Sequence, residues 1–343
     1  MKFSYALLAA FLFGLSTPLS KILLNDFSPV MLASLYYLGS GFILYVLSFF
    51  KITSQETSFE KNDIPYIIGF VVCGGIIAPV MFFTGLKLIN ALNVSILLNF
   101  ELILTALIAW LFFKEHISLN LVVSMILITL SAIMLGFDIK SFKFSSSYGV
   151  ILVMFACFMW AIDNNLTSKI SLKNPLNIAI IKGLAGGSIN FILAFLTNQL
   201  IINITSLLYG TIVGFICYGI SLYLLILAMR YIGASRAIAI FSTNPFIGIF
   251  FSFLLLNEPI SFQIIVAFFL ASLAVFLVLT EKHSHLHKHE FLEHEHLHIH
   301  DEHHKHKHDH EIPKDFQHTH RHIHEEIEHS HPHTPDIHHK HNH

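Results

Sequence analysis

Charged residues are scarce in this chain of 343 residues. Only 12% are Asp, Glu, Lys or Arg, whereas a soluble globular chain has about 25%. Cysteine is scarcer still: three residues, an odd number inside apolar segments, which we interpret as packing residues rather than a disulfide framework. In contrast, 54% of the residues are hydrophobic, and 33 are Phe. This composition excludes a disordered chain and argues against a water-soluble fold.

The scarcity of charge is confined to one part of the chain. Residues 1–280 hold 13 Lys and Arg against 9 Asp and Glu, a net charge of +4. Residues 281–343 hold 7 against 13, a net charge of −6 with histidine neutral, and 24 of the 25 histidines. The chain therefore divides into an apolar body and a polar tail, to which different physical rules apply.

The body consists of long apolar segments separated by short polar breaks. A helix needs about 20 apolar residues to cross roughly 30 Å of hydrocarbon. Strands of a membrane barrel would alternate apolar and polar residues, whereas these segments are apolar on every face. We therefore expect an all-α membrane protein with ten transmembrane helices, at about residues 3–23, 29–50, 64–86, 91–113, 119–138, 148–170, 175–197, 207–229, 235–256 and 262–280.

Lysine and arginine near the ends of the spans predict the orientation. With the N-terminus in the cytoplasm, nine of these residues face inward and four face outward, which agrees with the positive-inside rule. An even number of spans then places both termini in the cytoplasm. We expect a multi-pass protein of a bacterial cytoplasmic (inner) membrane, in contact with membrane lipid.

The body contains an internal repeat. Residues 84–118 align without gaps with residues 227–261 at an offset of 143. Each repeat holds five spans, and since five is odd, the second repeat enters the membrane in the opposite sense. The matched pairs include Lys87 with Arg230, Glu115 with Glu258, and Ser118 with Ser261, two serines suited to helix N-caps. The predicted divisions are a first repeat at 1–140, a second at 145–280 and a disordered tail at 281–343.

These residues resemble the drug/metabolite transporter superfamily, specifically its ten-helix branch with two EamA-type domains. The resemblance covers about residues 3–280. Two positions depart from the family pattern: Leu102 replaces the usual proline, and Asn244, before Pro245, stands where the acid would be. The features that carry the resemblance are the turns Gly85-Leu86-Lys87 and Ala228-Met229-Arg230, the stretch Asn99-Phe100-Glu101, which is similar to the family's N-x-E-P, and the helix-closing acids Glu115 and Glu258.

The resemblance implies a secondary transporter with a central cavity that opens alternately to each side. Spans one, three, four, six, eight and nine would line this cavity between two five-helix halves. The solute would be a small organic metabolite, an amino acid or a drug, and no cofactor would be required. We see no nucleophile triad, phosphate loop or nucleic-acid patch in the sequence, so we expect neither an enzyme nor a nucleic-acid partner. The protein would act as a monomer or a homodimer.

Three ionisable residues lie inside predicted spans: Glu101, Asp163 and Lys182. A charged group in hydrocarbon costs at least about 2.5–3.5 kcal/mol, so it needs a partner, a wet cavity or a function. One hypothesis is that Glu101 or Asp163 contacts a cationic group of the solute or exchanges a coupling proton. The alternative is an internal ion pair with Lys182 that fixes the helix packing.

Further polar and aromatic residues near these positions are candidates for solute binding. Trp160 is either a stacking partner for the solute or an apolar wall. Pro245 frees a backbone carbonyl next to Asn244, which lines the cavity or simply kinks the helix. Glu115 and Glu258 are interpreted as structural residues that close the turns before Ser118 and Ser261. The predicted solute-binding residues are Asn99, Glu101, Trp160, Asp163, Asn164 and Asn244.

Histidine recurs at every second position of much of the tail. This spacing puts imidazoles on one face of an extended chain and on opposite sides of a helix. The tail has too few apolar residues for a core, so we expect disorder. Imidazole binds Zn, Ni, Co and Cu, and the carboxylates of the tail can complete the coordination shell. The predicted metal ligands are His283, His285, His287, His289, His294, His296, His298, His300, His304, His306, His308 and His310.

Three functions remain open on the sequence alone. The favoured one is transport of a small organic solute, with a tail that buffers or senses transition metal, feeds it to the pore, or has no role. The second is export of Ni, Co or Zn collected by the tail, although the spans offer few ligands beyond Glu101 and Asp163. The third is a membrane-anchored metal-storage protein, which the internal repeat disfavours.

Overall fold

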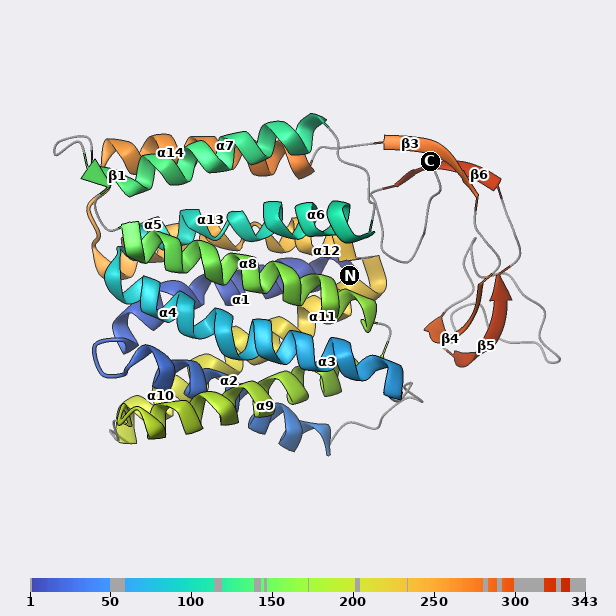
Figure 1. The fold of residues 1–343 in the computed structure, drawn as a ribbon, viewed down its shortest axis with the longest axis horizontal. Helices are drawn as coiled ribbons and strands as arrows, with labels where there is room; N and C mark the ends of the chain where they lie inside the picture. The colour runs from blue at the N-terminus through green and yellow to red at the C-terminus, as the bar shows by residue number, and fades with distance from the viewer. Residues whose placement is uncertain are drawn as a thin grey trace.

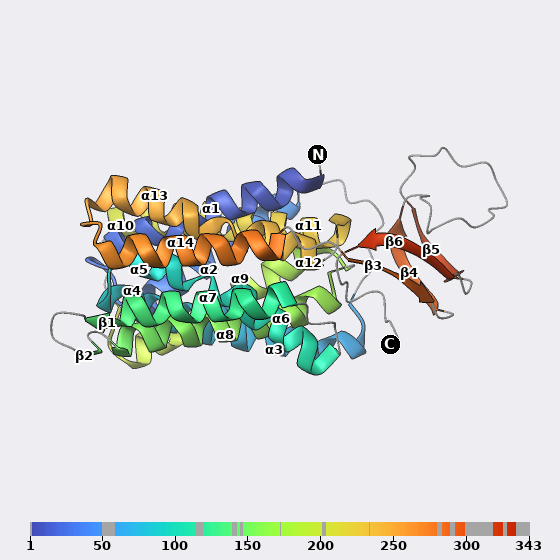
Figure 2. The same cartoon turned by 90° about the horizontal axis from the view of Figure 1, so that it is seen from above.

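The body of the protein is a bundle of helices that run back and forth along one axis (Figures 1 and 2). In this computed structural model, eight helices are long and apolar enough to cross a membrane by length and composition. Two shorter apolar helices, Val122–Leu135 and Phe262–Leu277, complete the ten predicted segments. The structure describes residues 2–49, 59–113, 119–138, 143–144, 147–171, 173–200, 204–232, 234–279, 283–288, 292–298, 318–324 and 328–333.

The helices begin and end within a few residues of the predicted spans. The first repeat contains α1 (Lys2–Leu23), α2 (Pro29–Ser48), the continuous stretch η1 (Lys61–Asp63), α3 (Ile64–Phe70), η2 (Val71–Ile77) and α4 (Ala78–Leu88), then α5 (Ala91–Leu97), α6 (Phe100–Phe113) and α7 (Leu119–Gly136). A two-stranded link, β1 (Phe137–Asp138) with β2 (Lys143–Phe144), leads to the second repeat. That repeat contains α8 (Ser147–Lys169), α9 (Pro175–Leu196), α10 (Ile204–Val213), η3 (Gly214–Ile220), α11 (Ser221–Ile232), α12 (Ala234–Phe241), α13 (Asn244–Leu256) and α14 (Phe262–Leu279).

The internal repeat extends to irregularities of the helices. Both η2 and η3 are π-helical turns, and the offset of 143 maps one onto the other, since 71 + 143 = 214 and 77 + 143 = 220. Spans four and nine are both broken near their middle, between α5 and α6 and between α12 and α13. π-turns are often found at functional sites. The shared positions of these features confirm that the two repeats have the same design.

The two repeats run in opposite senses, as predicted. The α4–α5 turn, which carries Lys87, lies at one end of the bundle, and the α11–α12 turn, which follows Arg230, lies at the other (Figure 1). The start of α1 and the end of α14 lie at the same end (Figures 1 and 2).

The two repeats are interleaved rather than arranged as separate halves. Helix α1 of the first repeat packs against α11 and α13 of the second, and α8 of the second packs against α4 and α6 of the first. Repeat-related helices also pair with each other, α2 with α9 and α7 with α14. The implied picture of two five-helix halves on either side of a cavity is therefore corrected: helices of the two repeats pack directly on one another.

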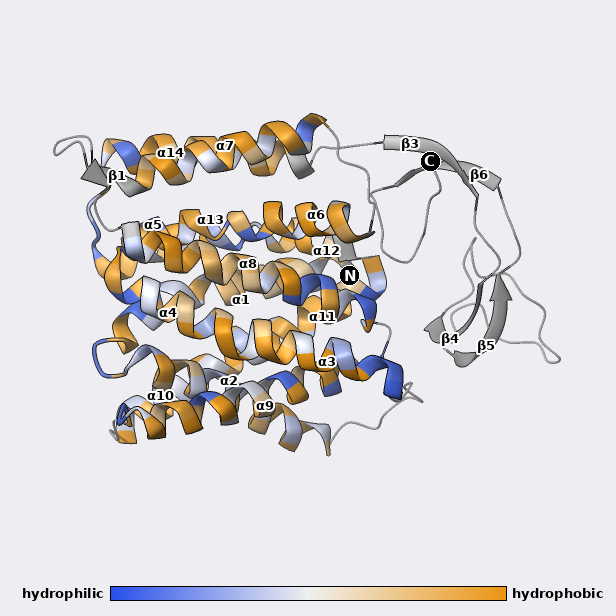
Figure 3. Cartoon of the chain, in the orientation of Figure 1, coloured by the Kyte–Doolittle hydropathy of each residue, from blue (hydrophilic) through white to orange (hydrophobic). Residues whose placement is uncertain are grey.

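Glycines allow a close helix contact between α2 and α9. A Cβ atom at Gly183 would lie 2.6 Å from the Cα of Gly41 and 2.8 Å from the carbonyl oxygen of Tyr37. Since only glycine leaves room for backbones at this distance, the pair has the small-residue packing typical of membrane helices. Outward-facing residues are large and apolar, such as Phe112 and Phe276, so the bundle presents a surface suited to lipid (Figure 3).

The described segments of the tail are four short strands, where disorder was expected. The strands β3 (His283–Lys288) and β6 (Glu328–His333) form one antiparallel pair, and β4 (Leu292–His298) and β5 (His318–His324) form another. Their register places histidine opposite histidine, for example His285 opposite His331 and His296 opposite His320. Alternating histidines are compatible with an extended backbone, which explains this form. The other tail residues, including the predicted ligands His289, His300, His304, His306, His308 and His310, lie outside the described residues.

We expect Gly183→Ala to lower the thermal stability of the protein in detergent. The added methyl group would collide with backbone atoms of α2, which cannot move unless the helix moves with them. Overpacking of this kind costs about 1–3 kcal/mol. Differential scanning fluorimetry would measure the change. Gly69→Ala is the matched control, because its Cβ would meet only the end of the Leu166 side chain. Equal stability of the two variants would contradict this account of the α2–α9 contact.

Candidate functional site

A cavity near the middle of the bundle brings together four of the six predicted solute-binding residues. Glu101, Trp160, Asp163 and Asn164 line it. Its volume is about 50 Å³, which holds a few water molecules, whereas sites for drug-sized ligands measure about 300–1,000 Å³. Helices must therefore move apart before a larger solute can bind. The other lining residues are Phe13, Tyr37, Ser40, Lys182, Gly183, Tyr218, Ser221, Leu222, Leu225 and Phe241.

Asp163 and Lys182 form a buried ion pair on one wall of this cavity. The Nζ atom of Lys182 donates to Oδ2 of Asp163, and both side chains are almost fully buried. The hydroxyl of Thr167 donates to the other carboxylate oxygen, at 3.1 Å. The Asp163 carboxylate lies against Gly74 of η2, where a Cβ atom would collide with it. The alternative of an internal ion pair is thus realised for Asp163.

Glu101 has a different environment. Its Oε1 atom accepts a hydrogen bond from the side-chain amide of Asn164, at 2.7 Å, and it forms no ion pair among the described residues. The side chain is 7% exposed. Helix α6 begins at Phe100, so the break in span four places Glu101 in the first turn of a helix, where a negative charge is favoured. The cavity therefore contains two carboxylates, of which Lys182 neutralises one.

Asn99 and Asn244 lie at the two helix breaks rather than in the cavity lining. The side-chain amide of Asn99 donates to the carbonyl of Ile96, and that of Asn244 donates to the carbonyl of Phe241, both at 2.9 Å. Each amide thus satisfies a carbonyl that the broken helix leaves without its usual partner. The Oδ1 atoms of both residues are buried and have no hydrogen-bond partner among the described residues.

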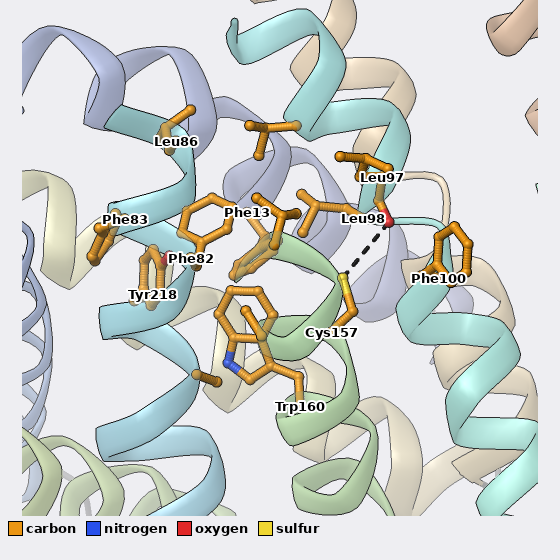
Figure 4. Close-up of a cluster of buried hydrophobic side chains, with 14 of the residues drawn as sticks. Phe13, Phe82, Phe83, Leu86, Leu97, Leu98, Phe100, Cys157, Trp160 and Tyr218 are labelled. Carbon is orange, nitrogen blue, oxygen red and sulfur yellow. Dashed lines mark hydrogen bonds between the residues drawn. The ribbon is translucent and has the colours of Figure 1, made fainter. Parts of the chain in front are cut away.

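Aromatic side chains close one end of the cavity. Phe13 contacts Trp160, Tyr218 and Phe241, with ring centroids 5.3–5.8 Å apart. Phe82 packs against Trp160 at 5.3 Å. Figure 4 shows this layer between Trp160 and Leu86, the latter next to the α4–α5 turn. Cys157 is buried in the same cluster, where its thiol donates to the carbonyl of Leu97 (3.6 Å), in agreement with a packing role.

The cavity lining differs from the one implied by the resemblance. Spans one, four, six, eight and nine contribute as expected, but spans two and seven replace span three among the lining residues. Tyr37 and Ser40 of α2 and Lys182 and Gly183 of α9 line the cavity, near the glycine contact between these two helices. Tyr37, Tyr218 and Ser221 line the cavity but were not among the predicted residues. Their polar groups inside apolar spans were the signal that could have found them.

The ion pair makes a prediction about stability. We expect Lys182→Met to destabilise the protein by about 3–5 kcal/mol, because it leaves a buried carboxylate without its partner. Asp163→Asn in the same chain should recover most of this loss, since no unpaired charge then remains. A double-mutant cycle of unfolding free energies in detergent would measure the coupling. Additive effects of the two substitutions would show that the pair contributes nothing as a pair.

Comparisons with known proteins agree with this architecture. Residues 2–137 and residues 147–280 each match the EamA-like transporter family. An uncharacterized transporter of Methanothermobacter thermautotrophicus is 30% identical over 272 residues, which cover 74% of this chain and 78% of the relative. A crystal structure described only as that of a protein has a TM-score of 0.59 at 13% identity, covers 80% of this chain and 95% of its own, and shows the shared fold. With two matching domains and a cavity between interleaved helices, the chain belongs to the EamA-like transporter family of the drug/metabolite transporter superfamily, and it is a multi-pass membrane transporter rather than an enzyme.

Proposed function

We propose that this transporter carries a small organic metabolite, amino acid or drug by alternating access through the central cavity. In this proposal Glu101 binds a cationic group of the solute or a coupling proton. The observation that carries the proposal is the charge of the cavity lining: two carboxylates and one ammonium group, with the ammonium committed to Asp163. Glu101 is left with the neutral amide of Asn164.

An unneutralised carboxylate inside a membrane needs a positive charge or a proton. Either a protonated Glu101 or an organic cation beside it would leave the cavity neutral, so the two occupants would compete. Binding of solute at one side and of a proton at the other would then couple their movements. In this scheme Asn164 orients the Glu101 carboxylate, while Asp163 and Lys182 hold the wall in place.

The aromatic side chains of the lining favour an organic solute. Phe13, Trp160, Tyr218 and Phe241 line the same cavity as the polar groups, and an organic cation within about 6 Å of an aromatic face is attracted by it. We propose that Trp160 contacts the apolar part of the solute. Asn99 and Asn244 would act without contacting the solute, by stabilising the helix breaks at which spans four and nine can bend.

Transition-metal export is less well supported by the lining. The cavity offers carboxylates, amides and hydroxyls, and the described residues that line it include neither histidine nor cysteine. Within the described part of the chain, no group of three or more His, Cys, Asp or Glu side chains is placed to hold a metal ion. The family match shows a transporter, so we do not propose metal storage as the main function.

For the tail we propose binding of Zn, Ni, Co or Cu in a regulatory role. The support is chemical: the tail holds 24 histidines and 13 carboxylates in 63 residues, since 343 − 280 = 63, and imidazole suits these ions. We further propose that both termini face the cytoplasm of a bacterial cell. This agrees with the count of nine inward against four outward basic residues, and with the ends of α1 and α14 on one side of the bundle.

Replacing Glu101 tests the proposed coupling. In proteoliposomes, a panel of labelled amino acids and the cation ethidium would first identify a solute whose flux follows a pH gradient. We expect Glu101→Gln to lower this flux at least about tenfold and to abolish its pH dependence, because the variant cannot exchange a charge. Glu60→Gln is the matched control, an acid-to-amide change at an exposed carboxyl whose pKa Lys173 lowers through a hydrogen bond of 2.7 Å. Unchanged pH-dependent flux in Glu101→Gln would remove Glu101 from the mechanism.

Deleting residues 281–343 separates metal binding from transport. We expect the truncated protein to lose Ni²⁺ and Zn²⁺ binding in isothermal titration calorimetry, because most of the imidazoles are gone. Flux of the organic solute in proteoliposomes should continue. Loss of Ni²⁺ or Zn²⁺ movement across the membrane on deletion would instead support metal export.

A further inference from the structure

The α4–α5 turn is held by a carboxylate of the other repeat. The Oε1 atom of Glu258 accepts a hydrogen bond from the backbone N–H of Ala91, and its Oε2 atom accepts one from Leu92, both at 2.8 Å. These are the first two amides of α5, which have no partner within the helix. A carboxylate at this position forms charge-assisted hydrogen bonds and is favoured by the helix dipole.

The backbone after α13 directs Glu258 to this turn. Asn257 ends α13 in the left-handed conformation, with φ of 50°, which reverses the chain direction at the helix end. Glu258 follows directly and reaches α5, which packs against α13. This corrects the interpretation that Glu258 closes its own turn before Ser261. Ser261 fulfils its predicted role as N-cap by accepting from the N–H of Ile264, at 3.3 Å. Glu115 and Ser118 lie outside the described residues.

A lysine holds the other side of the same turn. The Nζ atom of Lys21, at the end of α1, donates to the carbonyl oxygens of Leu86 at 2.7 Å and Ile89 at 2.8 Å. Leu86 belongs to the last turn of α4, the negative end of the helix dipole, and Ile89 is the extended residue that follows the helix. The turn between α4 and α5 is thus held by an anion on its amides and a cation on its carbonyls. We call Glu258 and Lys21 the turn clamp.

A layer of buried side chains separates the turn clamp from Trp160 of the cavity lining. Phe82, Phe83 and Leu86 of α4 are fully buried between the cavity and this turn. Helix α5 is seven residues long, and its far end is the break that precedes Glu101. A displacement of the first turn of α5 would therefore act on both the aromatic layer and the segment that carries Glu101.

We propose that Glu258 is a positioning residue of the transport cycle: its two hydrogen bonds to α5 keep this end of the cavity closed, and they must break for it to open. The inference rests on the proposed alternating access. Glu258 follows α13 of the second repeat and α5 belongs to the first, so the two bonds tie the first turn of α5 to a segment from the other repeat. Lys21 supports the closed state from α1.

The test is a distance measurement that needs no solute. Spin labels at Leu88→Cys and Ile260→Cys, two exposed positions on α4 and after α13, would report the separation across this end by pulsed electron paramagnetic resonance. The parent is the full chain with Cys73, Cys157 and Cys217 replaced. We expect one short distance in the parent. Glu258→Gln, which can accept only one of the two bonds, should raise the ratio of long to short distances about tenfold.

Further variants keep the result interpretable. Glu258→Ala should increase the long-distance population further, Lys21→Met should increase it, and Glu60→Gln at the opposite end should leave it unchanged. If Glu258→Ala does not elute as a folded protein in size-exclusion chromatography, the proposal is judged from the distance distributions of Glu258→Gln and Lys21→Met. A distance distribution in folded Glu258→Gln identical to that of the parent would overturn the proposal. Solute flux that is independent of Glu101 would overturn the proposed function and leave this distance result standing.

Discussion

Hydrocarbon does not tolerate a charge without a partner, and this constraint organises the middle of the bundle. Lys182 of α9 and Asp163 of α8 meet because neither could remain charged alone at that depth. Gly74 of η2 leaves room for the Asp163 carboxylate, because a Cβ atom there would collide with it. The wall of the cavity is thus a neutral pair set among glycines, and Glu101 stands opposite it with an amide as its partner.

The inverted repeat supplies a symmetric frame for an asymmetric site. Both repeats have a π-turn in their third span and a break in their fourth, at equivalent positions. The charge is not repeated: Glu101 corresponds to Asn244 at the offset of 143. A symmetric frame can adopt two related states of similar energy, as alternating access requires. The single carboxylate at one break is the place where we propose that a cation or a proton binds.

Charged side chains also have partners at the end of the bundle, where these partners are backbone amides and carbonyls. The amides and carbonyls on either side of the α4–α5 turn are satisfied by Glu258 and Lys21, residues from the second repeat and from α1. The repeats are interleaved, so such contacts cross between them. This arrangement explains how a short helix such as α5, which could not be stable alone, is fixed at its first turn.

The sequence by itself determined the spans, their number and the inverted sense of the repeats, because the length of an apolar run and the parity of five spans need no knowledge of contacts. It also indicated Glu101, Asp163 and Lys182, since charge in an apolar segment is visible in one dimension. Only the tertiary structure decided which acid was neutralised, which spans lined the cavity and where Glu258 was bound. Those outcomes depend on how closely α2 approaches α9 and how α13 ends at Asn257, and such distances arise from packing between segments more than 100 residues apart.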